Sequence, residues 1–166
     1  MEKEYTVSEF TRYDNELLIS YDAEASGRLD RDYWRVRKGF RYYVGHLDSN
    51  MWVDVPAGKL TDGATVPFPF NALIPVWGSY GQAVVVHDTL CDTYTVSKLV
   101  DGRVVQRPVS RKEIDQIFNE AMKVLKVESW RRKLIMSGVT LYRLVKRPKR
   151  PERNRTKEKL EAQWVL

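Results

Sequence analysis

The chain has 166 residues, enough for one domain with a sizeable core and too few for two comfortable ones. Its hydrophobic share is 43% and its single Cys91 excludes an internal disulfide, so we expect a core that folds without covalent staples. No apolar run approaches the roughly 18 residues of a membrane span, and the polar start MEKEYTVSEF lacks the pattern of a signal peptide for export.

The first half of the sequence predicts strands and turns. Residues 40–44 and 51–55 alternate between apolar and polar side chains and are separated by GHLDSN, which is typical of a β-hairpin. Residues 17–20 and 33–36 carry shorter strand patterns. The segment 62–75 holds three of the seven prolines, so we expect an ordered but irregular loop there.

The second half begins with a helix and a second hairpin. Residues 80–92 are compatible with a helix whose first two turns are small and apolar. Two short apolar runs, 98–100 and 103–105, flank Asp101 and Gly102, the pair that a tight two-residue turn prefers.

Two further helices follow. Ser110 and Glu113 form a capping box ahead of apolar residues at helical spacing. Another helix is expected from about Ser129 to Val145 and ends before the first of two prolines. The sequence thus predicts an α+β fold over residues 1–145, in which a small antiparallel sheet of N-terminal β-hairpins packs on a C-terminal bundle of about three helices.

The last segment, residues 146–166, predicts an extended basic arm. Residues 146–159 contain eight Lys or Arg and two Glu, which accounts for the net charge of +6 of the whole chain. The end of the arm turns apolar at Trp164 and Leu166, which predicts that it docks into a neighbouring protein. Binding of the arm to nucleic acid is a further hypothesis, although the segment lacks the interleaved aromatic residues that stack on bases.

His87 and Asp88 stand side by side at the end of an apolar run, VVVHDTLCD, where a core is expected. In a helix the two side chains differ by about 100° in direction, so Asp88 cannot orient the ring of its neighbour. A histidine base needs a carboxylate from elsewhere, and Asp115 borders the apolar face of the next helix. We therefore expect Asp115 to hydrogen-bond His87, and Asp88 to point to Asp62 in the preceding loop.

Two carboxylates and nearby backbone carbonyls favour a hard cation such as calcium, so Asp88 and Asp62 are candidate metal ligands. The competing interpretation is structural, because a lone histidine in an apolar helix is more often a satisfied core residue than a catalyst. Cys91 lies one turn after His87 without basic neighbours that would activate a thiol.

Three blocks, taken in order, resemble the family of domain of unknown function 1353. They are VPAGKLTDGATVP, YGQAVVVHDTLCD and SRKEIDQIFNEAMKVLKVESWRRKLIMSGVTLYRL. The family typically shows VPxGFxTDGASVP, an apolar segment ending in HDxLY, and an Asp-bearing helix before a final Arg-containing helix. The resemblance covers about residues 52–145 and carries over to Thr61, Asp62, Gly63, Ala64, Pro67, His87, Asp88, Leu90, Asp115, Phe118, Ala121 and Met122.

The resemblance implies a bacteriophage or prophage protein, since the family's members occur largely there. The pattern is also similar to the secreted phospholipase A2 core, in which His activates water, the adjacent Asp binds calcium and a Tyr steadies a distant Asp. Two departures matter: Lys59 and Leu60 replace the Gly-Phe-like approach to the loop, and Cys91 stands where the family commonly has Tyr. The second removes a hydroxyl from the supposed network.

The residues and the resemblance together favour a virion-associated structural component, in the tail, baseplate or connector, made in the host cytoplasm and docked to other virion proteins through its arm. The alternative is a cation-dependent, phospholipase-like hydrolase of the cell envelope, with His87 as general base and Asp115 as its orienting partner. The candidate interaction residues are Phe68 and Phe70 in the proline-rich loop and, in the arm, Lys146, Arg147, Lys149, Arg150, Arg153, Arg155, Trp164 and Leu166.

Overall fold

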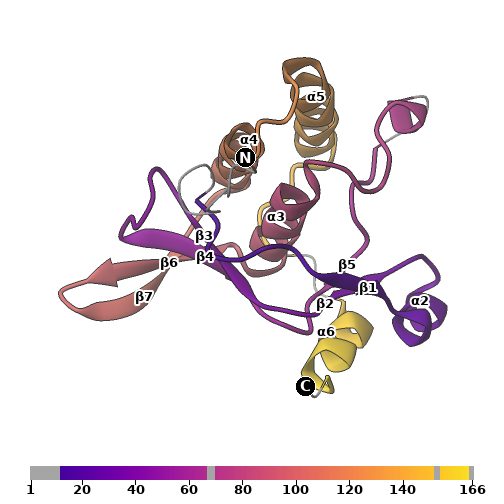
Figure 1. Ribbon diagram of the computed structural model, residues 1–166, viewed down its shortest axis with the longest axis horizontal. Coiled ribbons are helices and arrows are strands. Elements are labelled where there is room, and N and C mark those ends of the chain that lie inside the picture. Colours follow the sequence, from indigo (N-terminus) through magenta and orange to yellow (C-terminus); the bar gives the residue numbers. More distant parts are fainter. Residues whose placement is uncertain (1–11, 67–69, 152–153, 165–166) are drawn as a thin grey trace, which may run out of the picture.

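The computed structural model describes residues 12–66, 70–151 and 154–164, and it has the predicted α+β organisation (Figure 1). Strands dominate the N-terminal half and helices the C-terminal half, apart from one short early helix and one late hairpin. In the described part of the chain, no helix is both long and apolar enough to cross a bilayer, as the sequence predicted.

One sheet has three short antiparallel strands in the order β1 (Ile19–Tyr21), β2 (Trp34–Val36) and β5 (Leu60–Thr61). Helix α2 (Ala23–Leu29) connects the first two strands. Its N-cap is Asp22, whose side chain accepts a 2.8 Å hydrogen bond from the Ala25 amide and so satisfies a free donor of the first turn.

The other sheet has four antiparallel strands in the order β3 (Phe40–Tyr43), β4 (Met51–Val55), β6 (Thr95–Val100) and β7 (Arg103–Pro108). Both predicted hairpins are present in it. The second turns at Asp101 and Gly102, both with positive φ, as a tight two-residue turn requires. This β6–β7 hairpin projects from the body of the molecule (Figure 1).

The helical half comprises a short 3-10 turn, η1 (Phe70–Ala72), and helices α3 (Gly81–Thr93), α4 (Arg111–Val124), α5 (Ser129–Lys146) and α6 (Arg155–Ala162). The predicted cap of α4 is confirmed: the Ser110 hydroxyl accepts from the Glu113 amide at 3.2 Å.

Helix α3 is the centre of the main core, because its side chains are buried on several faces. The apolar face of α4 packs on α3, and α3 in turn covers the inner face of strand β4. The most deeply buried apolar side chains of this core include Tyr42, Val55, Val85, Val86, Leu90, Ile114 and Met122. Residues on α3 and α4 are therefore held rigidly relative to one another.

The C-terminal arm differs from the prediction of an extended segment, because residues 155–162 form helix α6. Leu160 of α6 is 5% exposed and packs with Ala25, Tyr33 and Leu60 in a small second core. The predicted docking residue Trp164 lies over Gly58 and beside Arg37 of the same chain. The surface that receives the described part of the arm thus belongs to the protein itself.

Candidate functional site

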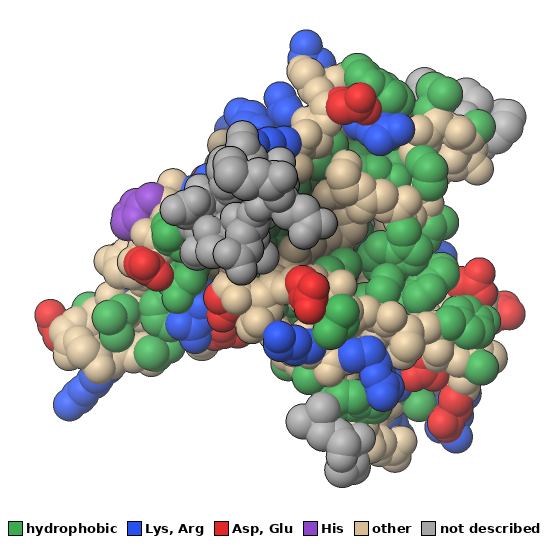
Figure 2. All heavy atoms as spheres, in the orientation of Figure 1, with side chains coloured by type: hydrophobic (Ala, Val, Ile, Leu, Met, Phe, Trp, Pro, Cys, Tyr) green, Lys and Arg blue, Asp and Glu red, His purple; other side chains and the backbone are tan. Residues whose placement is uncertain are grey.

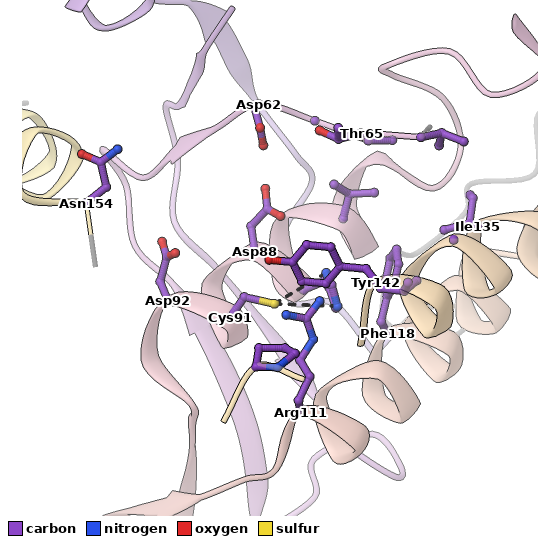
Figure 3. Close-up of a pocket in the computed structure, with 18 of the residues that line it drawn as sticks. Asp62, Thr65, Asp88, Cys91, Asp92, Arg111, Phe118, Ile135, Tyr142 and Asn154 are labelled. Carbon is purple, nitrogen blue, oxygen red and sulfur yellow. Dashed lines mark hydrogen bonds between the residues drawn. The ribbon is translucent and has the colours of Figure 1, made fainter. Parts of the chain in front are cut away.

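A cavity of about 600 Å³ lies beside α3. Its walls come from the loop after β5, from α3, α4 and α5, and from the start of α6 (Figure 3). The predicted site residues Asp62, His87 and Asp88 all line this cavity, and so does Cys91. The structure therefore brings together residues that the sequence placed on separate elements.

His87 and Asp115 form the hydrogen bond that their sequence positions predicted. The Nε2 atom of His87 lies 3.0 Å from Oδ1 of Asp115, across the interface of α3 and α4. Both residues are buried, at 8% and 2% exposure. The His87 ring also stacks on Phe118 with a centroid distance of 4.4 Å, which fixes the plane of the imidazole.

Two arginines hold the charge on Asp115. Arg111 Nε lies 3.1 Å from Oδ1 and Arg143 Nε lies 3.0 Å from Oδ2. Burial by itself raises the pKa of Asp115, but the hydrogen bond from His87 and the charge of Arg111 outweigh it, so the pKa lies below its ordinary value. Asp115 is therefore an anion at neutral pH and accepts the proton of Nε2.

This arrangement fixes the tautomer of His87. Burial, with a smaller contribution from Arg111, lowers the pKa of the imidazole against the opposing effect of Asp115, so the ring is neutral at neutral pH. With the proton on Nε2, Nδ1 carries the lone pair and can act as a base. The sulfur of Cys91, which lines the cavity, lies 3.9 Å from Nδ1 and 3.8 Å from Nε2.

Cys91 is not an activated nucleophile. Burial raises the pKa of its thiol to about 12, so the thiol keeps its proton at neutral pH. Its place in the wall beside His87 gives the cavity a small, weakly polar surface there.

Asp88 points away from His87 toward the loop after β5, as the helical geometry predicted. Its Oδ2 accepts a 2.7 Å hydrogen bond from the Thr61 hydroxyl, and its carboxylate and that of Asp62 point toward one another (Figure 3). Burial and the negative charge of Asp62 raise the pKa of Asp88 to about 7. The carboxylates of Asp62 and Asp88 together provide a place where positive charge is stabilised.

The predicted cation ligands fit calcium only in part. Among the described residues, no group of three or more His, Cys, Asp or Glu side chains could hold a metal ion together. Asp62 also forms a 2.7 Å ion pair with Arg31. Asp62 and Asp88 supply the oxygen ligands that calcium prefers, and its other ligands would be backbone carbonyls or water.

Residues 30–139 match the family described as Protein of unknown function (DUF1353). The chain belongs to this family. No curated protein and no solved structure matches the chain. The DUF1353 match contains His87, Asp88, Asp115, Asp62 and Thr61, and it ends within α5, so α6 lies beyond it.

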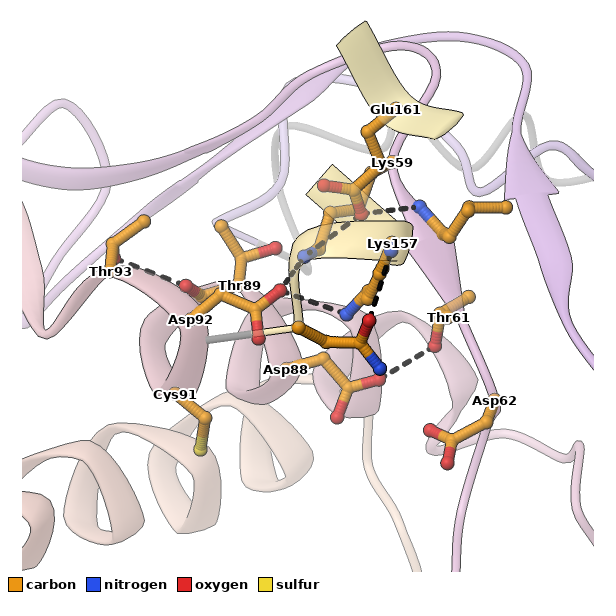
Figure 4. Close-up of polar contacts among 12 residues, drawn as sticks. Lys59, Thr61, Asp62, Asp88, Thr89, Cys91, Asp92, Thr93, Lys157 and Glu161 are labelled. Carbon is orange, nitrogen blue, oxygen red and sulfur yellow. Dashed lines mark hydrogen bonds and ion pairs between the residues drawn. The ribbon is translucent and has the colours of Figure 1, made fainter. Parts of the chain in front are cut away.

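A second polar cluster of this DUF1353 protein was not predicted from the sequence. The ammonium of Lys59 is buried and pairs with Asp92 and, at 3.4 Å, with Glu161 of α6, while Lys157 reaches the same Asp92 carboxylate at 2.9 Å (Figure 4). Burial raises the pKa of Asp92, but the two lysines outweigh burial and lower it. Lys59 departs from the family pattern at this position, and this departure was the sequence signal for the cluster, since a buried lysine requires acidic partners.

The predicted interaction residues divide into three groups. Phe68, Arg153 and Leu166 lie outside the described residues, and Phe70 belongs to η1, where the structure describes only its backbone. Five of the predicted residues have exposed side chains, and Arg150 among them also lines the cavity; the five are Lys146, Arg147, Lys149, Arg150 and Arg155. Trp164 contacts its own chain.

Proposed function

We propose that this protein is a hydrolase that cleaves an ester bond in an amphiphilic molecule of the cell envelope. One observation carries the proposal: a neutral His87, oriented by the buried Asp115, lines a cavity large enough for part of a lipid-sized substrate. A structural histidine requires its hydrogen bond but has no need to line a cavity.

The lining of the cavity supports an amphiphilic substrate. Its apolar lining residues include Val84, Phe118, Ile135 and Val139 from α3, α4 and α5. Its charged lining residues include Asp62, Asp88, Lys157 and Arg150. An acyl chain fits the apolar residues, and a polar or anionic head group fits the charged ones.

The reaction follows from the tautomer of His87. Nδ1 takes a proton from a water molecule while the water oxygen attacks the ester carbonyl carbon. The carbon–oxygen bond to the leaving alcohol then breaks, and the imidazolium returns its proton to the alcohol oxygen. Asp115 stabilises the imidazolium that exists between these steps.

A cation between Asp62 and Asp88 would polarise the ester carbonyl and stabilise the negative oxygen of the tetrahedral intermediate. Without a cation, the positive charges of Lys157 and Lys59 act on Asp88 and lower its pKa, against the larger effects of burial and Asp62. The effect of calcium on turnover is therefore measured separately from turnover itself.

The test is hydrolysis of a phospholipid with a fluorogenic acyl ester in mixed micelles, with and without calcium. His87→Ala should abolish turnover, and the matched variant His46→Ala should retain it, because His46 lies on the surface away from the cavity. Equal turnover in wild type and His87→Ala would refute the assignment of the base, and no turnover in the folded wild type would refute the hydrolase.

A structural role in a phage virion is a second candidate, favoured by the β6–β7 hairpin. Val104 and Val105 are 58% and 43% exposed on this projection, and Figure 2 shows hydrophobic side chains along it. Exposed apolar side chains on a protruding hairpin are typical of contacts between proteins. Mass spectrometry of purified particles tests the candidate, and absence of the chain from the particles would exclude it.

A further inference from the structure

The C-terminal end of α5 carries an apolar patch that faces solvent. Leu141, Leu144 and Val145, here called the α5 patch, are 59%, 62% and 68% exposed. They are three and four residues apart, so they share one face of the helix. Trp130, 49% exposed, lies three turns earlier on nearly the same face. Contiguous apolar side chains of this size on a helix mark a binding surface.

The charge around the α5 patch is of one sign. Residues 129–151 contain eight Lys or Arg and no Asp or Glu. Four of these cations, Lys146, Arg147, Lys149 and Arg150, follow the α5 patch directly and are exposed. A helix with Trp and Leu on one face and Lys or Arg beside it is typical of a segment that lies in the interface of an anionic bilayer.

The same segment forms part of the cavity wall. Tyr142, Pro148 and Arg150 line the cavity that also contains His87 (Figure 3). The Arg111 guanidinium lies 5.3 Å from the centre of the Tyr142 ring. A bilayer in contact with the α5 patch would therefore lie next to the part of the cavity formed by α5 and the arm.

We propose that the α5 patch and the cations of residues 146–150 bind the surface of an anionic lipid bilayer and bring the cavity to its lipids. The lipid as substrate rests on the proposed function, whereas binding to the bilayer can be measured without turnover. Long basic side chains suit this task, because their apolar stems cover the patch while their charges reach the head groups. Each cation near an anionic surface strengthens binding about fivefold at physiological salt.

The experiment is sedimentation of the full chain with vesicles of phosphatidylcholine alone and of phosphatidylcholine with phosphatidylglycerol. We expect binding to the anionic vesicles that falls about tenfold or more in the double variant Leu144→Ser, Val145→Ser, since two large apolar side chains leave the interface. The matched control is Val104→Ser, Val105→Ser on β7, which removes comparably exposed apolar side chains from the hairpin and should bind like wild type.

Three results would overturn the proposal: equal binding to neutral and anionic vesicles, unchanged binding in the α5 double variant, and light scattering that shows the α5 patch holding two copies of the chain together. His87→Ala separates this proposal from the hydrolase, because it should bind vesicles like wild type while it loses turnover. Vesicle binding without turnover would support the bilayer surface and refute only the hydrolase.

Discussion

Asp115→Asn tests whether the buried carboxylate stabilises the folded protein. Asp115 is 2% exposed and contacts His87, Arg111 and Arg143. The amide keeps the shape but removes the charge, which leaves the Arg111 guanidinium buried without a charged partner. Loss of one member of a buried pair costs about 3–5 kcal/mol, and because Arg143 is partly exposed we expect about 3 kcal/mol. Urea unfolding followed by tryptophan fluorescence measures this difference.

The pH dependence supplies the sharper test. The folded pKa of Asp115 lies below the ordinary value of 3.8, so its stabilising effect is complete above about pH 4 and disappears as the pH falls through the folded pKa. The difference in the free energy of unfolding between wild type and Asp115→Asn should therefore become smaller in acid. Glu128→Gln, which removes an exposed partner of Arg131, should cost less than about 1 kcal/mol. A gap below 1 kcal/mol for Asp115→Asn, or one that does not narrow in acid, would refute the reasoning.

Three other substitutions test the arm and the cavity. Leu160→Ala should cost about 2–3 kcal/mol and speed tryptic cleavage within α6; unchanged cleavage would mean that this side chain does not hold the helix. Gly58→Ala places a Cβ 2.8 Å from the Trp164 ring, and the φ of residue 58 is +88°. We therefore expect the free energy of unfolding to fall by more than about 1 kcal/mol and the tryptophan emission to shift to the red. An unshifted spectrum would contradict the contact. For Asp88, whose pKa is raised to about 7, the folded wild type keeps a proton that the unfolded chain releases, so its stability falls as the pH rises from about 4 to 7. Asp88→Asn lacks this loss, so its melting temperature should rise relative to that of wild type between about pH 4 and about pH 7; a constant difference would refute the raised pKa.

The contact of His87 with Asp115 was predictable because both residues belong to long helices with clear apolar patterns. Helical spacing fixes which side chains face a neighbouring helix, and only one carboxylate bordered the right face. The same geometry predicted that Asp88 would point to the preceding loop, and its hydrogen bond with Thr61 places it there. Both predictions of side-chain direction depended on the helical spacing of residues, which is the same in the folded protein.

The fold of the arm was not predictable in this way. The basic run around Lys157 has the composition of a solvated linker, and its partner Asp92 lies 65 residues away. Strand β5 has only two residues, too few for a period-two pattern. Pairings over such separations leave no trace in a single sequence unless an unusual residue, such as the buried Lys59, draws attention to them.

The end of the family match inside α5 divides the cavity into two parts. The hydrogen-bonded pair of His87 and Asp115 lies in the matched portion, whereas three other lining residues, Tyr142, Arg150 and Lys157, come from sequence after residue 139. Arg143, which pairs with Oδ2 of Asp115 at 3.0 Å, also lies after residue 139, so the charge balance of the buried pair depends on the segment beyond the match as well. The residues after position 139 therefore contribute both to the lining of the cavity and to the charge around Asp115.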